Sequence, residues 1–144
     1  MKAINVFCIL FCILLFSAPS CHNPEVIDYT GQYQGIMTIF YEDYEEIEYD
    51  LQLTLYHNTS DQQVTGADYW ANIESEGTGI VANDILDFST VVINPIFNGT
   101  VEYQSQGEDT NGDLLIDAMN MGNVVLVFDD GQRYPGYFNV NRID

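Results

Sequence analysis

Basic residues are nearly absent from this sequence. It carries three lysines and arginines against 22 aspartates and glutamates, which gives a formal net charge of −19 at pH 7. Such a charge repels nucleic-acid phosphates and anionic lipid headgroups, so nucleic-acid binding is excluded as a function. Cations and proteins with a basic surface are electrostatically favoured as partners. The same charge would also serve solubility alone, without any binding role.

Histidine and cysteine are scarce as well, and this removes the usual parts of nucleophilic and zinc chemistry. The histidines are His22 and His57, too few for a histidine-based zinc site, and no serine has a Gly-x-Ser-x-Gly context. The many acidic residues could supply a carboxylate pair for glycoside hydrolysis, but their number prevents the selection of any one pair. We therefore expect no enzyme, with a carboxylate-based hydrolase as the weakest alternative.

No apolar run is long enough to cross a bilayer as a helix. The longest, Val6–Phe16, is well short of the roughly 20 residues required, and it leads into Ser17-Ala18-Pro19-Ser20-Cys21. This order predicts a secretory signal peptide over residues 1–20. It resembles the signals of bacterial lipoproteins, in which the cysteine becomes the first mature residue and is acylated, although Ala18 stands where leucine is usual. An ordinary signal peptide, which would leave Cys21 as a free thiol, is the alternative.

The resemblance implies a membrane anchor of diacylglycerol and palmitate on Cys21. His22 follows this cysteine in place of the aspartate that retains some lipoproteins in the inner membrane, so we expect the outer membrane of the cell envelope, with its periplasmic or surface face left open. Cys8 and Cys12 leave with the signal, so no disulfide framework remains. The mature chain loses one lysine and no acid, which brings its charge to about −20. Residues 21–30 are expected to form a short tether.

Helical apolar stripes are missing after the signal, and β-strand patterns replace them. Gln32–Tyr41 is rich in strand formers, and Glu46–Tyr56 alternates strictly, which predicts a long hairpin across an acidic tip at residues 42–45. Asn83-Asp84 is typical of a tight hairpin turn. The apolar face of the second strand consists of Ile47, Tyr49, Leu51, Leu53 and Leu55.

Further short strands follow along the chain. Val64–Ile73 is predicted as the third strand, Glu74–Gly79 as a glycine-rich turn, Leu114–Met121 as a late strand and Arg133–Arg142 as the last. Eight to nine such strands predict a single all-β domain over residues 31–144. We expect an antiparallel up-and-down meander that closes into a barrel or half-barrel, because closure removes exposed edges. A two-sheet β-sandwich is the alternative.

Gly31-Gln32-Tyr33 before the first strand and Arg142 on the last resemble a pair of features in the lipocalin-like (calycin) barrels. Those proteins carry Gly-x-Trp at the first strand and a basic residue on the last, where the cation packs over the ring and plugs one end of the barrel. The resemblance implies that Tyr33 and Arg142 form this plug. Tyrosine replaces the tryptophan of the family.

One loop has the spacing of a calcium site. Asp109, Asn111 and Asp113 place oxygen atoms at alternate positions, as the start of a calcium loop does, so they are candidate metal ligands. Leu114 occupies the position of the EF-hand glycine, and strands surround the loop instead of helices. The alternative is a plain hairpin loop that turns at Gly112. No other cofactor is expected.

Aromatic residues supply the remaining candidate for a site. Trp70 and the ten tyrosines could line a cavity for a small apolar or glycan ligand, or they could fill the barrel. The leading hypothesis is a membrane-anchored acidic barrel that binds a small ligand or an envelope partner. The alternative is a structural or interaction lipoprotein with a filled core.

Overall fold

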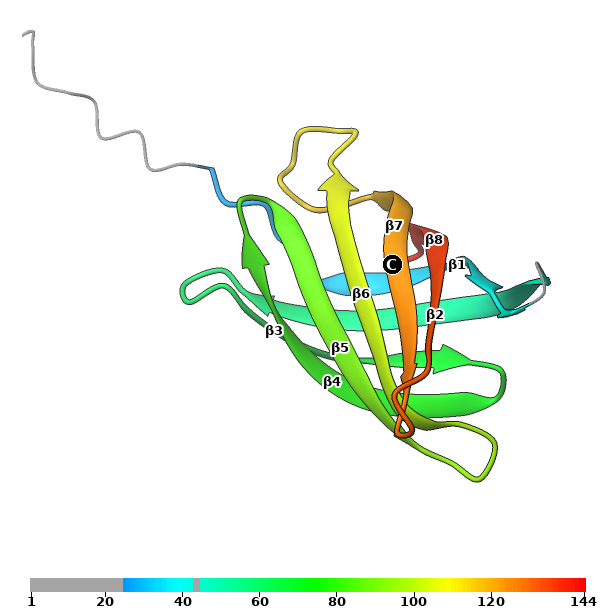
Figure 1. Cartoon of the computed structure of the whole chain (residues 1–144). Helices are drawn as coiled ribbons and strands as arrows, with labels where there is room; N and C mark the ends of the chain where they lie inside the picture. The colour runs from blue at the N-terminus through cyan, green and yellow to red at the C-terminus, as the bar shows by residue number, and fades with distance from the viewer. Residues whose placement is uncertain (1–24, 43–44) are drawn as a thin grey trace, which may run out of the picture.

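Eight antiparallel strands follow one another around a closed barrel (Figure 1). The computed structural model describes residues 25–42 and 45–144. The strands are β1 Gly31–Phe40, β2 Glu46–Asn58, β3 Gln63–Trp70, β4 Ile73–Ala82, β5 Ile85–Ile93, β6 Asn98–Glu108, β7 Ala118–Phe128 and β8 Arg133–Arg142. Each strand pairs with its sequence neighbours, and β1 pairs with β8. The predicted all-β meander is therefore confirmed, as a closed barrel and not a half-barrel or sandwich.

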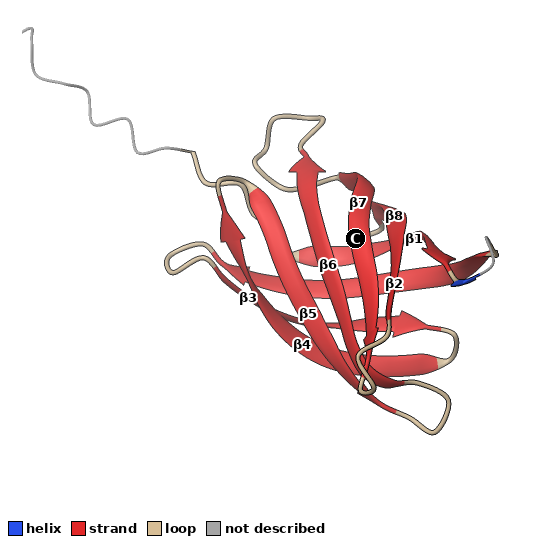
Figure 2. Cartoon of the chain, in the orientation of Figure 1, coloured by secondary structure: helices blue, strands red, loops and turns tan. Residues whose placement is uncertain are grey.

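Strands make up almost all of the regular structure, as Figure 2 shows. Their burial alternates with a period of two, which follows from an apolar interior and a solvated outer wall. In the part of the chain that the structure describes, no helix is long and apolar enough to span a membrane.

The β3–β4 hairpin differs from the prediction. The predicted strand Val64–Ile73 is confirmed as far as Trp70 and is wrong beyond it, because β3 ends there and a two-residue turn follows at Ala71 and Asn72, whose φ angles are 49° and 62°. The predicted turn at Glu74–Gly79 is also wrong, since this segment lies within β4. Its inward-facing positions hold serine and glycine, so the segment lacks the apolar alternation that marks a half-buried strand.

The region before β7 differs as well. Residues 109–117 form an irregular loop, and β7 begins at Ala118, so the predicted strand Leu114–Met121 is wrong over its first half. β7 then continues through Gly122, where its register against β8 shifts between Met119 and Gly122 in a bulge. β7 is thus a single bulged strand, and the barrel has eight strands, within the predicted eight to nine.

The seam between β1 and β8 depends on two glycines. A Cβ atom on Gly35 would lie 1.9 Å from the carbonyl oxygen of Asn139, and one on Gly136 would lie 2.0 Å from that of Thr38. Real Cβ contacts do not reach such distances. Each strand therefore contributes one position at which only glycine lets the seam close.

The turns divide between two ends of the barrel. The turns at 58–62 and 83–84 and the loop 109–117 lie at one end, together with residues 25–30, and this end is called the N-terminal end. In Figure 1 the blue start of the described chain and the yellow loop lie together there. The turns at 71–72, 94–97 and 129–132 lie at the other end, called the aromatic end for the side chains that close it.

The interior is filled by side chains from every strand. Its largest fully buried members are Tyr29, Tyr33, Tyr103, Phe88, Phe138, Met37, Ile39, Leu51, Leu53, Leu55, Leu86 and Ile116. Each large apolar side chain contributes about 1.5–3 kcal/mol on burial, so this core is the main source of stability. The filled interior matches the alternative in which aromatic residues pack the barrel.

Candidate functional site at the aromatic end

Six aromatic side chains close the aromatic end in a continuous ring, called here the aromatic ring. Its members are Tyr41, Tyr49, Trp70, Phe97, Phe128 and Tyr134. Five neighbouring pairs have centroid distances of 4.6 to 5.6 Å: Tyr49–Trp70, Trp70–Phe97, Phe97–Phe128, Phe128–Tyr134 and Tyr134–Tyr41. A hydrogen bond of 2.9 Å between the hydroxyls of Tyr41 and Tyr49 closes the circle. Such tilted and edge-on pairs add about 0.5–1.5 kcal/mol each beyond burial.

Strand ends and hairpin turns bring these six residues together. Trp70 is the last residue of β3, Phe128 the last of β7, and Tyr134 the second of β8, while Phe97 directly precedes β6. Trp70 and Phe97 are buried, whereas the other four members are half-buried. The ring therefore seals the barrel and still presents aromatic surface to solvent.

Exposed carboxylates lie at the same end of the barrel as the ring. They lie on the β1–β2 connection, on the first residues of β2 and on the β7–β8 connection, and they are called the acidic rim: Glu42, Glu45, Glu46, Glu48, Asp129 and Asp130. The described chain has two basic residues, and neither is free to neutralise the rim. Arg133 bonds to Glu102 over 2.7 Å, and Arg142 bonds to Asp144 at the opposite end.

A buried carboxyl group lies beneath the ring. Asp68 stands two residues before Trp70 on the same inward face of β3 and is 1% exposed. Its oxygens accept hydrogen bonds from the hydroxyls of Ser75, Thr90 at 2.8 Å and Tyr103 at 2.6 Å. The indole Nε1 of Trp70 is buried and has no hydrogen-bond partner among the described residues.

Burial controls the titration of this cluster. Removal from water raises the pKa of Asp68 above its usual 3.8, although the bonds from Ser75, Tyr103 and Thr90 act in the opposite direction. Burial, with the nearby Asp68 as a second cause, also raises the pKa of the Tyr103 phenol well above 10.0. The cluster contains one carboxyl group, whereas glycoside hydrolysis uses a pair. The hydrogen bonds to Asp68 join the four strands β3, β4, β5 and β6 inside the barrel.

The predicted calcium ligands lie together in the loop at the N-terminal end. The Asp109 carboxylate accepts bonds from the backbone N–H groups of Asn111, Gly112 and Leu114, at 2.7 to 3.2 Å. Asn111 caps the N–H of Asp113 in the same way, over 2.9 Å. Partial desolvation opposes these bonds, but the bonds prevail and lower the pKa of Asp109.

The spacing that suggests a calcium loop therefore serves to fold the loop itself. Among the described residues, no group of three or more acidic, histidine or cysteine side chains could hold a metal ion. Calcium binding by this loop stays a prediction.

Tyr33 and Arg142, the predicted plug, are direct partners across the β1–β8 seam. Tyr33 is fully buried, and its hydroxyl donates to the carbonyls of Tyr29 at 3.0 Å and Ile116 at 3.2 Å, while burial raises its pKa. The guanidinium of Arg142 lies against Gly31, since a Cβ atom on that glycine would stand 3.1 Å from the guanidinium carbon. Both side chains thus help to close the N-terminal end.

The sequence does not reveal the residue that closes this end most completely. Tyr29 falls within the predicted tether, yet it is fully buried. Its hydroxyl donates to the carbonyl of Asp84 over 2.7 Å and accepts from the N–H of Gly107 over 2.8 Å, and its backbone N–H donates to Nδ1 of His57. The preceding Asp28 forms an isolated bridge with the loop. The predicted signal peptide and Cys21 lie outside the described residues.

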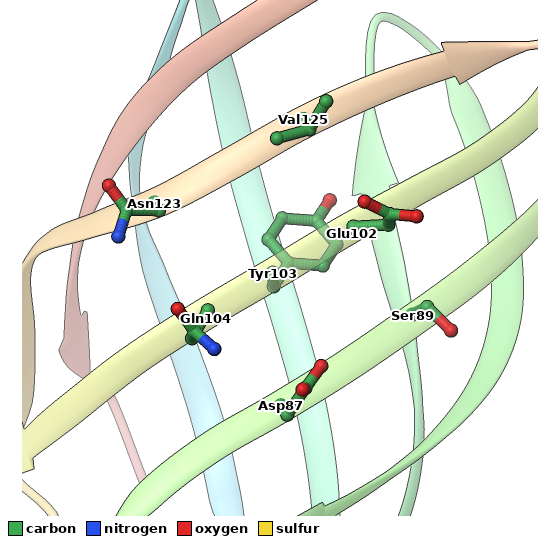
Figure 3. Close-up of a pocket in the computed structure, with 7 residues that line it drawn as sticks. All are labelled: Asp87, Ser89, Glu102, Tyr103, Gln104, Asn123 and Val125. Carbon is green, nitrogen blue, oxygen red and sulfur yellow. The ribbon is translucent and has the colours of Figure 1, made fainter. Parts of the chain in front are cut away.

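Two open pockets lie on the outer wall. One, of about 390 Å³, spans β5 to β7 and is drawn in Figure 3. Another, of about 740 Å³, lies over β2 to β5 and is lined mainly by threonine, glycine and glutamate. Glu102 in the first pocket already bonds to Arg133. Both are open to solvent, unlike the enclosed sites that small ligands prefer. The first is lined by Asp87, Ser89, Glu102, Tyr103, Gln104, Asn123 and Val125.

Comparison of the chain with protein-family models, with curated proteins and with solved structures gives no match. The closed eight-stranded meander is itself consistent with a lipocalin-like barrel. Because a barrel of this kind can carry many functions, the function must be argued from the aromatic end.

Proposed function

We propose that the protein is an acidic binding module of the cell envelope, which takes a small ligand at its aromatic end and does not act as a catalyst. The observation that carries the proposal is the aromatic ring, which gathers six rings from four hairpins at one barrel end. A contiguous aromatic surface at the protein boundary is a common feature of recognition sites.

The position of the N-terminal segment supports this choice of end. Tyr29 and the loop 109–117 occupy the N-terminal end, so that end is filled by the chain itself. If Cys21 is acylated, residues 21–27 reach at most about 25 Å from the membrane. The N-terminal end, where the tether attaches, then stays within that distance of the membrane, and the aromatic end lies at the opposite end of the barrel.

The sole tryptophan makes this proposal testable. Trp70 belongs to the ring, so its fluorescence is sensitive to a ligand bound at this end. We expect the neutral probe N-phenyl-1-naphthylamine to bind saturably and to receive energy transfer from Trp70. Tyr134→Ala should weaken binding at least tenfold, whereas Tyr56→Ala, which removes a 63% exposed tyrosine from the outer wall, should leave it unchanged. Non-saturable binding, or equal weakening by both variants, would overturn the proposal.

A protein partner is a second candidate, favoured by two exposed isoleucines. Ile93 and Ile96 are 88% and 87% exposed and lie beside Phe97 at the connection between β5 and β6. Photocrosslinking from position 96 in whole cells tests this candidate. A discrete adduct that disappears in Ile93→Asp would support a partner, and the absence of any adduct above background would count against it.

A further inference from the structure

We propose that the ligand of the aromatic end is a small organic cation with apolar substituents, of the alkylated ammonium class. This inference rests on the proposed function and adds the chemistry of the ligand to it. Three features of the aromatic end lead to it, and they concern hydrogen bonding, surface charge and the buried carboxyl group.

The aromatic ring offers π surface but few free polar groups. The hydroxyls of Tyr41 and Tyr49 bond to each other, and that of Tyr134 donates to the side-chain oxygen of Gln132 over 2.8 Å. Each of the three tyrosine hydroxyls already takes part in one such bond, so the ring offers a ligand mainly the faces of its side chains. A cation needs only the faces of the rings, which attract it through their quadrupoles within about 6 Å of a centroid.

The surface charge selects the same class of ligand. The acidic rim lies at the same end of the barrel as the ring. One of its members, Glu45, is joined directly to the ring residue Tyr41, because the backbone carbonyl of Glu45 accepts a hydrogen bond from the backbone N–H of Tyr41 over 2.9 Å. Charges within about 8 Å act on one another at physiological salt. Arg133, the basic residue that lies at this end, is held by Glu102. An anionic ligand is therefore repelled, and a cation meets no competing side chain among the described residues.

Asp68 adds an attraction from inside the barrel. It lies two residues from Trp70 on the same face of β3, a separation of about 7 Å along a strand. Burial raises the pKa of this group, and above that pKa its negative charge attracts a cation on the ring through a region of low dielectric constant. This contribution acts on the charge of a ligand and not on its apolar surface.

The test compares choline with 3,3-dimethylbutan-1-ol, a neutral molecule of nearly the same shape, by Trp70 fluorescence. We expect choline to bind about tenfold more tightly, in keeping with a cation–π contact, and its affinity to fall as salt rises. Asp68→Asn should weaken choline severalfold and leave the neutral analogue unchanged.

A charge-matched pair of variants isolates the rim. Glu45→Gln with Asp130→Asn removes two charges beside the ring, and Asp61→Asn with Glu108→Gln removes two at the N-terminal end. Only the first pair should weaken choline.

The outcomes separate this inference from the proposed function. Equal affinity for choline and its neutral analogue, or binding of the naphthylamine probe without binding of choline, overturns the ammonium class and leaves the aromatic end as a binding site. If neither choline nor the naphthylamine probe binds, both proposals fail. Equal effects of the two charge-matched pairs also overturn the inference, because the attraction would then come from net charge and not from the aromatic end.

Discussion

Replacing Tyr103 with phenylalanine measures how much the buried network of Asp68 stabilises the barrel. The change removes the hydroxyl that donates to Asp68 over 2.6 Å and keeps the ring that packs against Phe88 and Phe138. Tyr103 is 1% exposed, so water cannot replace the lost donor. Leaving a buried hydrogen-bonding group without its partner costs about 1–3 kcal/mol, and we expect the free energy of unfolding at pH 7 to fall by that amount.

Urea denaturation followed by Trp70 fluorescence provides the measurement. Tyr56→Phe is the matched control, because its hydroxyl lies on the outer wall, and it should change stability by no more than about 0.5 kcal/mol. If Tyr103→Phe were as stable as this control, the network would contribute nothing measurable and the reasoning would be refuted.

The pH dependence gives a second, independent readout of the same network. Burial raises the pKa of Asp68 above 3.8, so the folded state holds this proton more tightly than the unfolded state. The contribution of Asp68 to stability is therefore greatest below pH 3.8 and is lost as pH rises through the raised pKa. A tenfold difference in acid dissociation constant between the two states corresponds to about 1.4 kcal/mol.

The variants should change this pH profile in opposite directions. Tyr103→Phe removes a bond that lowers the pKa of Asp68, so the loss of stability should extend to higher pH. Asp68→Asn removes the titrating group and should abolish this component of the profile. Identical profiles for the wild type and Asp68→Asn would contradict the assignment.

Three further predictions concern the N-terminal end and the anchor. Tyr29→Phe should cost about 1–2 kcal/mol and speed amide exchange near Asp84 and Gly107, because it removes two partly buried hydrogen bonds. Unchanged exchange would count against this role. Asp109→Ala should speed amide exchange in the loop 109–117, because it removes the carboxylate that accepts the backbone N–H groups of this loop. Acidification through the lowered pKa of Asp109 should have the same effect. A calcium affinity equal in wild type and variant would rule out this loop as a calcium site. Cys21→Ser should abolish acylation and detergent-phase partitioning, and an unmodified wild-type mass would disprove the anchor.

The barrel could be predicted where burial on one face imposes a strict period of two. The strand predicted at Glu46–Tyr56 is observed as Glu46–Asn58, and the predicted bounds of Arg133–Arg142 match the structure. Prediction failed in β4, where Ser75 and Gly77 face inward. Ser75 is buried as a partner of Asp68, so a polar interior contact stands where the pattern requires an apolar one.

The candidate site was harder to predict because it depends on strand register. The aromatic ring joins residues from Tyr41 to Tyr134, and only the closed barrel brings them to one end. Asp68 could not be distinguished from the other acids, since its burial follows from cross-strand neighbours such as Ser75 and not from local sequence. Asp109 was identified by its spacing, but the same spacing fits backbone capping.

The glycine seam between β1 and β8 also bears on how the barrel folds. Seven of the eight strand pairings join sequence neighbours and can form as local hairpins, whereas β1 and β8 must meet across the whole chain. Until they meet, both are edge strands, open to pairing with another molecule. A side chain at Gly35 or Gly136 would prevent β1 from pairing with β8. The closed barrel would then become an open sheet that is prone to strand exchange and aggregation.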